Sequence, residues 1–354
     1  MQSPEPVSSL IPRAVANAAN GNAAHASRVG PRTLPDLVRH FERIEAEELP
    51  DVVMETKMLR MTPDGDIEVP QLHGHFALTD WSRGQLSSLL GVRWARWSED
   101  APADVVAEEV NRRLSRATGE VRVRSTEATF DGIAADGTIR AFVSPGYSTV
   151  ADSRVARLLA ELLDGEDVSV SRFDVTPMTT SYVLGVGKPL NPRAGSVVGD
   201  VRGSVLVQNS GTGWASLLVS LFLERLICSN GMRVSDSSSV RRTHRGIDDP
   251  RLKSLLANAV SNFGPRVHDA ADRLLRSTDR LISGPVKDAI EHLVVRVGKL
   301  PRRILPDIYD AYVVEPHASA FGVAQALTLA AQHMTPELRV ELESLAGRYL
   351  ADVN

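Results

Sequence analysis

The chain has 354 residues, of which 43% are hydrophobic and 24% are charged, so it can bury one large core or two. Its formal net charge of -4 gives no global basic signature of a nucleic-acid-binding protein. A single cysteine excludes an intrachain disulfide and a multi-cysteine zinc site, and it is typical of a reducing compartment. Apolar runs are too short for a membrane span and the first residues do not resemble a secretion signal, so we expect a cytoplasmic protein without a membrane partner.

The first half of the chain predicts an arm followed by alternating helices and strands. Residues 1–32 are rich in Ala, Asn, Ser and Pro, which is typical of a flexible arm. Apolar residues at helical spacing, with Thr79 as a cap, predict helices at 34–44, 80–90, 103–117 and 153–163. Alternating apolar residues and Asp-Gly turns predict strands at 52–61, 67–70, 120–126 and within 127–144.

The second half predicts more strands and then a run of helices. Residues 167–220 are rich in Val, Ser and Thr and are interrupted by glycine, which favours strands. The apolar run 215–227 fits a strand or a buried helix, and its context favours a strand that ends in a tight turn at Asn230-Gly231. Helical periodicity predicts helices near 250–262, 266–282, 285–296, 302–312, 317–332 and 335–350.

These elements together predict an α+β fold, with a mostly antiparallel sheet and packed helices followed by a helical C-terminal region. We divide the chain into the arm at 1–32, an α+β core domain at 33–249, and a helical region at 250–354 that packs on the core. The only cysteine, Cys228, follows Leu226 and Ile227, and this pattern favours a small buried side chain over a catalytic thiol or a metal ligand.

Four stretches resemble a phage- and plasmid-related family known as domain of unknown function 932. The main one is VLVQNSGTGWASLLVSLFLERLICSNGM, with an Asn-Ser turn and a later Cys-x-Asn-Gly corner. The others are WSRGQLSSLLGV, RAFVSPGYSTVADSRVARLLAEL and SAFGVAQALTLAAQHM, in the order that the family has them. The resemblance brings no established activity with it. A more distant similarity, at the level of fold, relates this pattern to the single-strand annealing recombinases.

Basic residues concentrate in one part of the chain. Residues 36–110 hold 16 acidic and 7 basic side chains, whereas residues 201–253 hold 4 acidic and 8 basic ones. Within the basic part, Arg241, Arg242 and Arg245 are spaced to contact successive phosphates. The alternative is a solvated loop whose charge is partly offset by Asp248 and Asp249.

Other candidate nucleic-acid contacts lie along the strands. Arg122 and Arg124 share one face of a predicted strand, because side chains repeat every second residue. Arg140 and Tyr147 place a cation and an aromatic ring near a Pro-Gly turn, where Tyr147 can stack on a base. The tryptophans are expected to pack in the core instead. Two further cations, Arg225 and Arg233, flank Cys228.

Three functions are compatible with these patterns. The first is a non-enzymatic nucleic-acid-binding protein that holds single-stranded DNA and assists annealing in recombination. The second is a structural or partner-binding protein of a mobile element, whose apolar helix faces also permit a homo-oligomer. The third is a metal-dependent nuclease built on Asp51, Glu55 and Lys57. Catalytic, metal-binding and cofactor-binding constellations are not evident in the sequence, and His73-Gly-His75 has too few neighbouring ligands for zinc.

Overall fold

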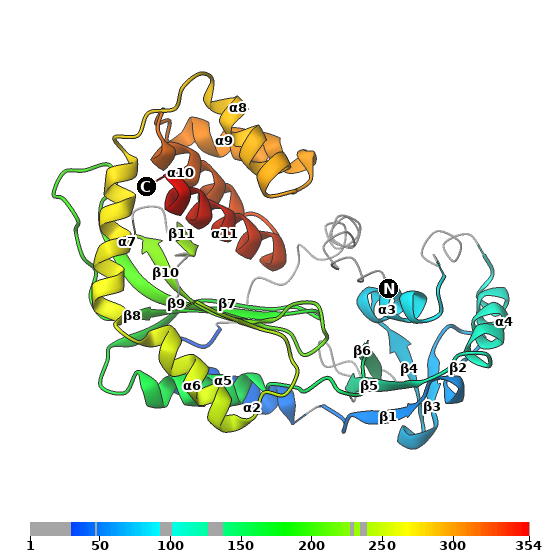
Figure 1. Cartoon of the computed structure of the whole chain (residues 1–354). Coiled ribbons are helices and arrows are strands. Elements are labelled where there is room, and N and C mark those ends of the chain that lie inside the picture. Colours follow the sequence, from blue (N-terminus) through cyan, green and yellow to red (C-terminus); the bar gives the residue numbers. More distant parts are fainter. Residues whose placement is uncertain are drawn as a thin grey trace, which may run out of the picture.

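A computed structural model of the chain describes residues 30–46, 48–92, 101–126, 137–226, 230–233 and 239–353. These residues form two β-sheets with helices packed on them, and a helical region ends the chain (Figure 1). All strand pairs are antiparallel except β4 with β6, which is parallel. The predicted α+β class, with a mostly antiparallel sheet and a helical C-terminal region, is therefore confirmed.

The first sheet has the strand order β1-β5-β6-β4-β3-β2. Its strands are β1 (Val52–Glu55), β2 (Arg60–Met61), β3 (Ile67–Val69), β4 (Gly74–Leu78), β5 (Glu120–Thr126) and β6 (Thr138–Val143). Helices α3 (Asp80–Leu89) and α4 (Ala103–Leu114) pack on it around a core that includes Leu86, Val110 and Val123. As predicted, Thr79 caps α3, because its side chain accepts a hydrogen bond from the Ser82 N–H at 3.0 Å.

The second sheet has the order β11-β10-β9-β8-β7, and β12 pairs with β10 beside this path. Its strands are β7 (Val168–Val175), β8 (Thr180–Val186), β9 (Val201–Asn209), β10 (Leu217–Arg225), β11 (Asn230–Arg233) and β12 (Val240–Arg242). The ambiguous run after residue 215 is thus a strand. Nearly every residue of β8, β9 and β10 is buried, because helices cover both faces of this sheet.

The two faces of the second sheet carry different helices (Figure 1). One face packs on α2 (Leu34–Glu45), α5 (Asp152–Leu162) and α6 (Asp249–Val260). Further along the same face, Val201, Leu221 and Leu223 pack on helices that follow in the chain. The opposite face carries Leu206, Leu218 and Phe222, which pack with Val340 of the last helix, α11 (Pro336–Val353). Helix α11 also holds the sheet by polar contacts, because the buried Glu343 accepts hydrogen bonds from Arg172 of β7.

The C-terminal region is built mainly of α-helices. They are α7 (Phe263–Ser277), α8 (Val286–Glu291), α9 (Leu305–Val314), α10 (Ala320–Ala331) and α11 (Pro336–Val353). A π-helical turn (His292–Val297) continues α8, and a short 3₁₀ turn (Arg302–Ile304) precedes α9. Within the described residues, no helix is both long and apolar enough to cross a membrane.

Several local predictions require correction. The predicted strand at 52–61 is interrupted by a 3₁₀ turn (Thr56–Met58). Asn230 and Gly231 do not form a turn but begin β11, where they pair with Arg225 and Glu224 of β10. Strands β4 and β12 were not expected. Cys228 and the predicted strands at 127–136 lie outside the described residues.

Candidate nucleic-acid interface

The predicted arginine face of β5 and β6 lies at the junction of the two sheets. Arg124 is buried, and its side chain bonds Asp51 at 2.9 Å and Glu48 at 3.0 Å. Arg122 bonds the carbonyl oxygen of Pro145 at 2.7 Å and lies 3.5 Å from Asp51. Arg140 forms an ion pair with Glu48. The carboxylates of Glu48 and Asp51 therefore offset the positive charge of these three arginines, which the sequence predicted to contact phosphates.

The same network holds the loop between β9 and β10, which we call the NSGTG loop (residues 209–213). Arg124 donates a hydrogen bond to the carbonyl oxygen of Gly211. A Cβ atom on Gly211 would lie 2.3 Å from the Arg124 guanidinium, so a larger residue here would displace the Arg124 side chain from its contacts. From α3, Trp81 and Gln85 donate to the carbonyl oxygen of Thr212 at 3.0 Å and 2.9 Å. The loop thus joins the two sheets.

Buried polar contacts fix the base of the NSGTG loop. The hydroxyls of Ser210 and Thr212 donate to the carbonyl oxygen of Met178 at 2.8 Å and 2.9 Å. The Asn209 side-chain amide donates at 2.8 Å to the carboxylate of Asp152, in the first turn of α5. Burial raises the pKa of Asp152 to about 6, although hydrogen bonds from Asn209 and Thr180 oppose that shift.

Tyr147 anchors a second loop at the same end of the sheet. Its hydroxyl donates to the carbonyl oxygen of Ser210 at 2.7 Å, and its ring stacks on His244 with centroids 5.1 Å apart. Burial raises the Tyr147 pKa to about 12 and lowers the His244 pKa to about 4, so both rings are neutral at pH 7. Tyr147 therefore holds the two loops together. His244 covers one face of the Tyr147 ring, so a base cannot stack on that face.

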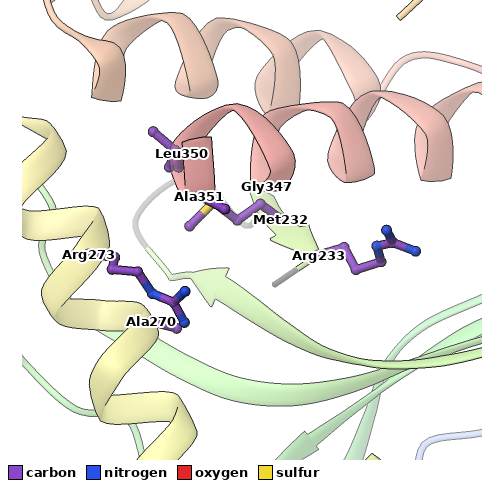
Figure 2. Close-up of a pocket in the computed structure, with 7 residues that line it drawn as sticks. All are labelled: Met232, Arg233, Ala270, Arg273, Gly347, Leu350 and Ala351. Carbon is purple, nitrogen blue, oxygen red and sulfur yellow. The ribbon is translucent and has the colours of Figure 1, made fainter. Parts of the chain in front are cut away.

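Arg225 and Arg233 lie away from this junction. Arg225 is buried, donates to the Val198 carbonyl oxygen at 2.8 Å, and pairs with Glu315 at 2.6 Å, so it links β10 to the C-terminal region. Arg233 lies on β11, and Figure 2 shows it with Arg273 of α7 beside a small hollow. The other residues that line this hollow are mostly apolar: Met232, Ala270, Gly347, Leu350 and Ala351.

Arg241, Arg242 and Arg245 differ from all the other predicted contacts. Their side chains are exposed, and within the described residues the structure gives them no ion pair. Arg241 pairs in register with Leu218 of β10, and Arg242 with Leu217. Because neighbouring strand residues point to opposite faces, these two arginines lie on either side of the sheet edge. Arg245 follows in the loop that His244 anchors.

Trp81 of α3 and Trp214, which precedes β10, form an edge-to-face pair. Their ring centroids are 4.7 Å apart at an interplanar angle of 77°. Contrary to expectation, neither belongs to a hydrophobic core cluster, and both are partly exposed. Trp214 follows the NSGTG loop, and its N–H donates to the Ser210 hydroxyl at 3.1 Å. The other two tryptophans, Trp94 and Trp97, lie outside the described residues.

These tryptophans and the three arginines lie toward the same end of the second sheet. Trp214 precedes Leu217, which faces Arg242 across the strand pair, so the chain enters β10 beside the place where it leaves β12. Contacts through Ser210, Tyr147 and His244 connect both segments. We call this set the Trp–Arg surface: Trp81, Trp214, Arg241, Arg242 and Arg245.

The carboxylates considered for a nuclease are engaged elsewhere. Asp51 bonds Arg124, and Glu55 pairs with Lys57 at 2.6 Å on the surface. His73 and His75 are exposed. In the part of the chain that the structure describes, no group of three or more His, Cys, Asp or Glu side chains is arranged to hold a metal ion.

Comparison with known proteins finds a family similarity for part of the chain. Residues 141–311 match the model of the family described as Domain of unknown function (DUF932). This segment holds the second sheet, the NSGTG loop and the three exposed arginines, whereas the segments with α3 and α10 fall outside it. The searches of curated proteins and of solved structures found no match to the chain.

Proposed function

Taking residues 141–311 as a DUF932 domain, we propose that the chain binds single-stranded DNA at the Trp–Arg surface. One observation carries this proposal: a partly exposed tryptophan pair lies at the same sheet end as three exposed arginines that form no ion pair with any described residue. Aromatic rings stack on unpaired bases whatever their sequence, and arginines neutralise the phosphates between them. A duplex hides its bases, so the stacking contribution favours single strands.

The paired arginines support this surface indirectly. Arg124 holds the Gly211 carbonyl oxygen, and Trp81 and Gln85 hold that of Thr212, so the loop that presents Trp214 is fixed from two sides. Binding then requires little ordering of the loop, which lowers its entropic cost. We therefore assign Arg122, Arg124, Arg140 and Tyr147 the role of positioning residues for this surface. Annealing of complementary strands in recombination is the activity that we propose for such a protein.

The test is DNA binding by the purified full chain, measured by fluorescence anisotropy with labelled single-stranded DNA, duplex DNA and RNA over a range of salt. Trp214→Ala is compared with Trp214→Phe, which keeps an aromatic face. We expect Trp214→Ala to weaken single-strand binding by roughly tenfold or more, and Trp214→Phe to retain most of it. Equal binding by both variants, or tighter binding to duplex than to single strands, contradicts the proposal.

A second candidate function is protein binding by the C-terminal region. Its most exposed large apolar side chains are Leu281 at 76%, Val313 at 72% and Val314 at 75%. Such side chains favour contact with another protein or with a second copy of the chain. A mass measured across concentrations, without nucleic acid, tests self-association. A constant monomer mass argues against a homo-oligomer.

A further inference from the structure

A second basic surface lies in the C-terminal region, between α8 and α9. Residues 292–303 hold four basic side chains and no acidic one. We call Arg296, Lys299, Arg302 and Arg303 the basic turn. All four are exposed, and Arg302 pairs with Glu291 at 2.8 Å. Among the described residues, the structure gives the other three no ion-pair partner. Glu291 therefore offsets one of the four positive charges, and three stay without an ion pair within the described residues.

The backbone at Lys299 is strained. Lys299 has φ 53°, in the left-handed region that closes the helical segment, and Leu300 N–H donates to the Val294 carbonyl oxygen at 2.9 Å. Glycine is the favoured residue in this position because it has no Cβ atom. Gly298 stands one position earlier, where a Cβ atom would lie 2.7 Å from Leu345 of α11. Glycine therefore stands at position 298, where a side chain would crowd Leu345, and lysine stands at position 299, where the backbone conformation favours glycine.

Helix electrostatics account for only half of this charge. Cations at the end of a helix are stabilised by its dipole, which explains Arg296 and Lys299. Arg302 and Arg303 instead precede α9, where positive charge opposes the dipole. A non-glycine residue in the left-handed region, such as Lys299, is strained, and such residues cluster at functional sites.

We propose that the basic turn is a second contact for the phosphate backbone of a bound single strand. This inference rests on the proposed function. Arg241 lies on the sheet face of Leu218, which packs against Val340 of α11, so the Trp–Arg surface extends toward the C-terminal region. Membrane-surface helices insert Trp, Phe and Leu side chains among lipids, whereas residues 292–303 contain no Trp or Phe and neither of their leucines, Leu293 and Leu300, is exposed. The chemistry therefore favours nucleic acid over an anionic membrane.

The first test changes charge. The variant Arg296→Ala, Lys299→Ala, Arg303→Ala is compared with Arg60→Ala, Lys188→Ala, Arg276→Ala, a control that removes three exposed cations elsewhere. For a long oligothymidine, we expect the slope of log affinity against log salt to fall by roughly 2 in the first variant only, since each phosphate contact to a single strand contributes about 0.7. Equal slopes in the two variants overturn the inference, as does tighter binding to vesicles of anionic lipid than to the oligonucleotide.

The second test separates binding from structure. Lys299→Gly removes the charge and also the backbone strain, so we expect a higher melting temperature together with weaker DNA binding. A lysine with only a structural role gives no loss of binding in this variant. If the wild-type chain does not bind single strands at all, the proposed function fails. If it binds and only Trp214→Ala weakens binding, the function stands and the basic turn is not a contact.

Discussion

Two sets of arginines that look alike in the sequence have different surroundings in the fold. Arg122, Arg124 and Arg140 share a junction with Glu48 and Asp51 and are at most partly exposed. Arg241, Arg242 and Arg245 are exposed on and just after an edge strand. The first set resembles the inside of a domain interface, and the second resembles a surface that meets an anion. Position relative to carboxylates, more than the density of arginine, distinguishes the two.

The largest effect that we predict is the loss of stability when Arg124, an arginine of the paired set, is replaced. Arg124→Ala leaves Glu48, Asp51 and the Gly211 carbonyl oxygen without their buried partner. Breaking a buried ion pair by removing one member costs about 3–5 kcal/mol when the remaining charge is uncompensated. Because Glu48 keeps Arg140 and Asp51 keeps Arg122, we expect the free energy of unfolding to fall by the lower end of that range, about 3 kcal/mol. Urea unfolding followed by far-UV circular dichroism measures it. A loss below about 1 kcal/mol would show that the junction does not depend on this arginine.

A second effect comes from the buried carboxyl at the base of the NSGTG loop. The pKa of Asp152 rises from 3.8 to about 6 on folding, so the folded protein binds more protons than the unfolded chain between these values. Stability therefore falls as pH rises through this window, by about 3 kcal/mol when complete. We expect Asp152→Asn to remove this pH dependence and to stabilise the protein at pH 7.5. Parallel unfolding curves for both proteins from pH 4.5 to 7.5 contradict this.

A smaller effect is expected at the aromatic pair. Trp214→Ala should weaken binding to single-stranded DNA by about 1–3 kcal/mol, the usual contribution of one stacked base. Because Trp214 packs on Trp81 and lies outside the core clusters, the free energy of unfolding should change less. Titration and urea unfolding of the same preparations compare the two quantities. A stability loss larger than the binding loss would make Trp214 a structural residue.

The smallest effect that we predict is the change in protein stability when one of the exposed arginines is replaced. Arg241→Ala, Arg242→Ala and Arg245→Ala should each change the free energy of unfolding by no more than about 0.5 kcal/mol, since exposed side chains without partners contribute little. Thermal unfolding of the three single variants beside the wild type measures this. A marked loss in any one of them would mean that the arginine has a structural partner after all.

Local features were predictable from the sequence, and long-range pairings were not. The helix after Thr79 was predictable because its cap and apolar spacing lie within one segment. Strands β4 and β12 are short, so their own residues give little signal. Strand β4 forms by pairing with β3 and β6, and β12 forms by pairing with β10. The Asn230-Gly231 turn was wrong because a turn-forming pair can also begin a strand.

The candidate site was predictable only in part. Exposure of the arginines around His244 follows from their dense charge, and the structure agrees with that. The pairing of Arg124 with Asp51 spans 73 residues, and that with Glu48 spans 76, so no local pattern signals either. Trp81 likewise bonds Thr212 across 131 residues of sequence and packs on Trp214. A sequence pattern gives the type of a residue but not its surroundings in the fold. It therefore cannot show whether a charged side chain is paired within the protein or available to a ligand.

The most direct test of the central claim is the salt dependence of single-stranded DNA binding by the wild type and by the variant Arg241→Ala, Arg242→Ala, Arg245→Ala. If these arginines contact phosphates, the slope of log affinity against log salt should be shallower in the variant by roughly 2, at about 0.7 per contact. Identical slopes and affinities, or no binding by the wild type even at low salt, would contradict the account.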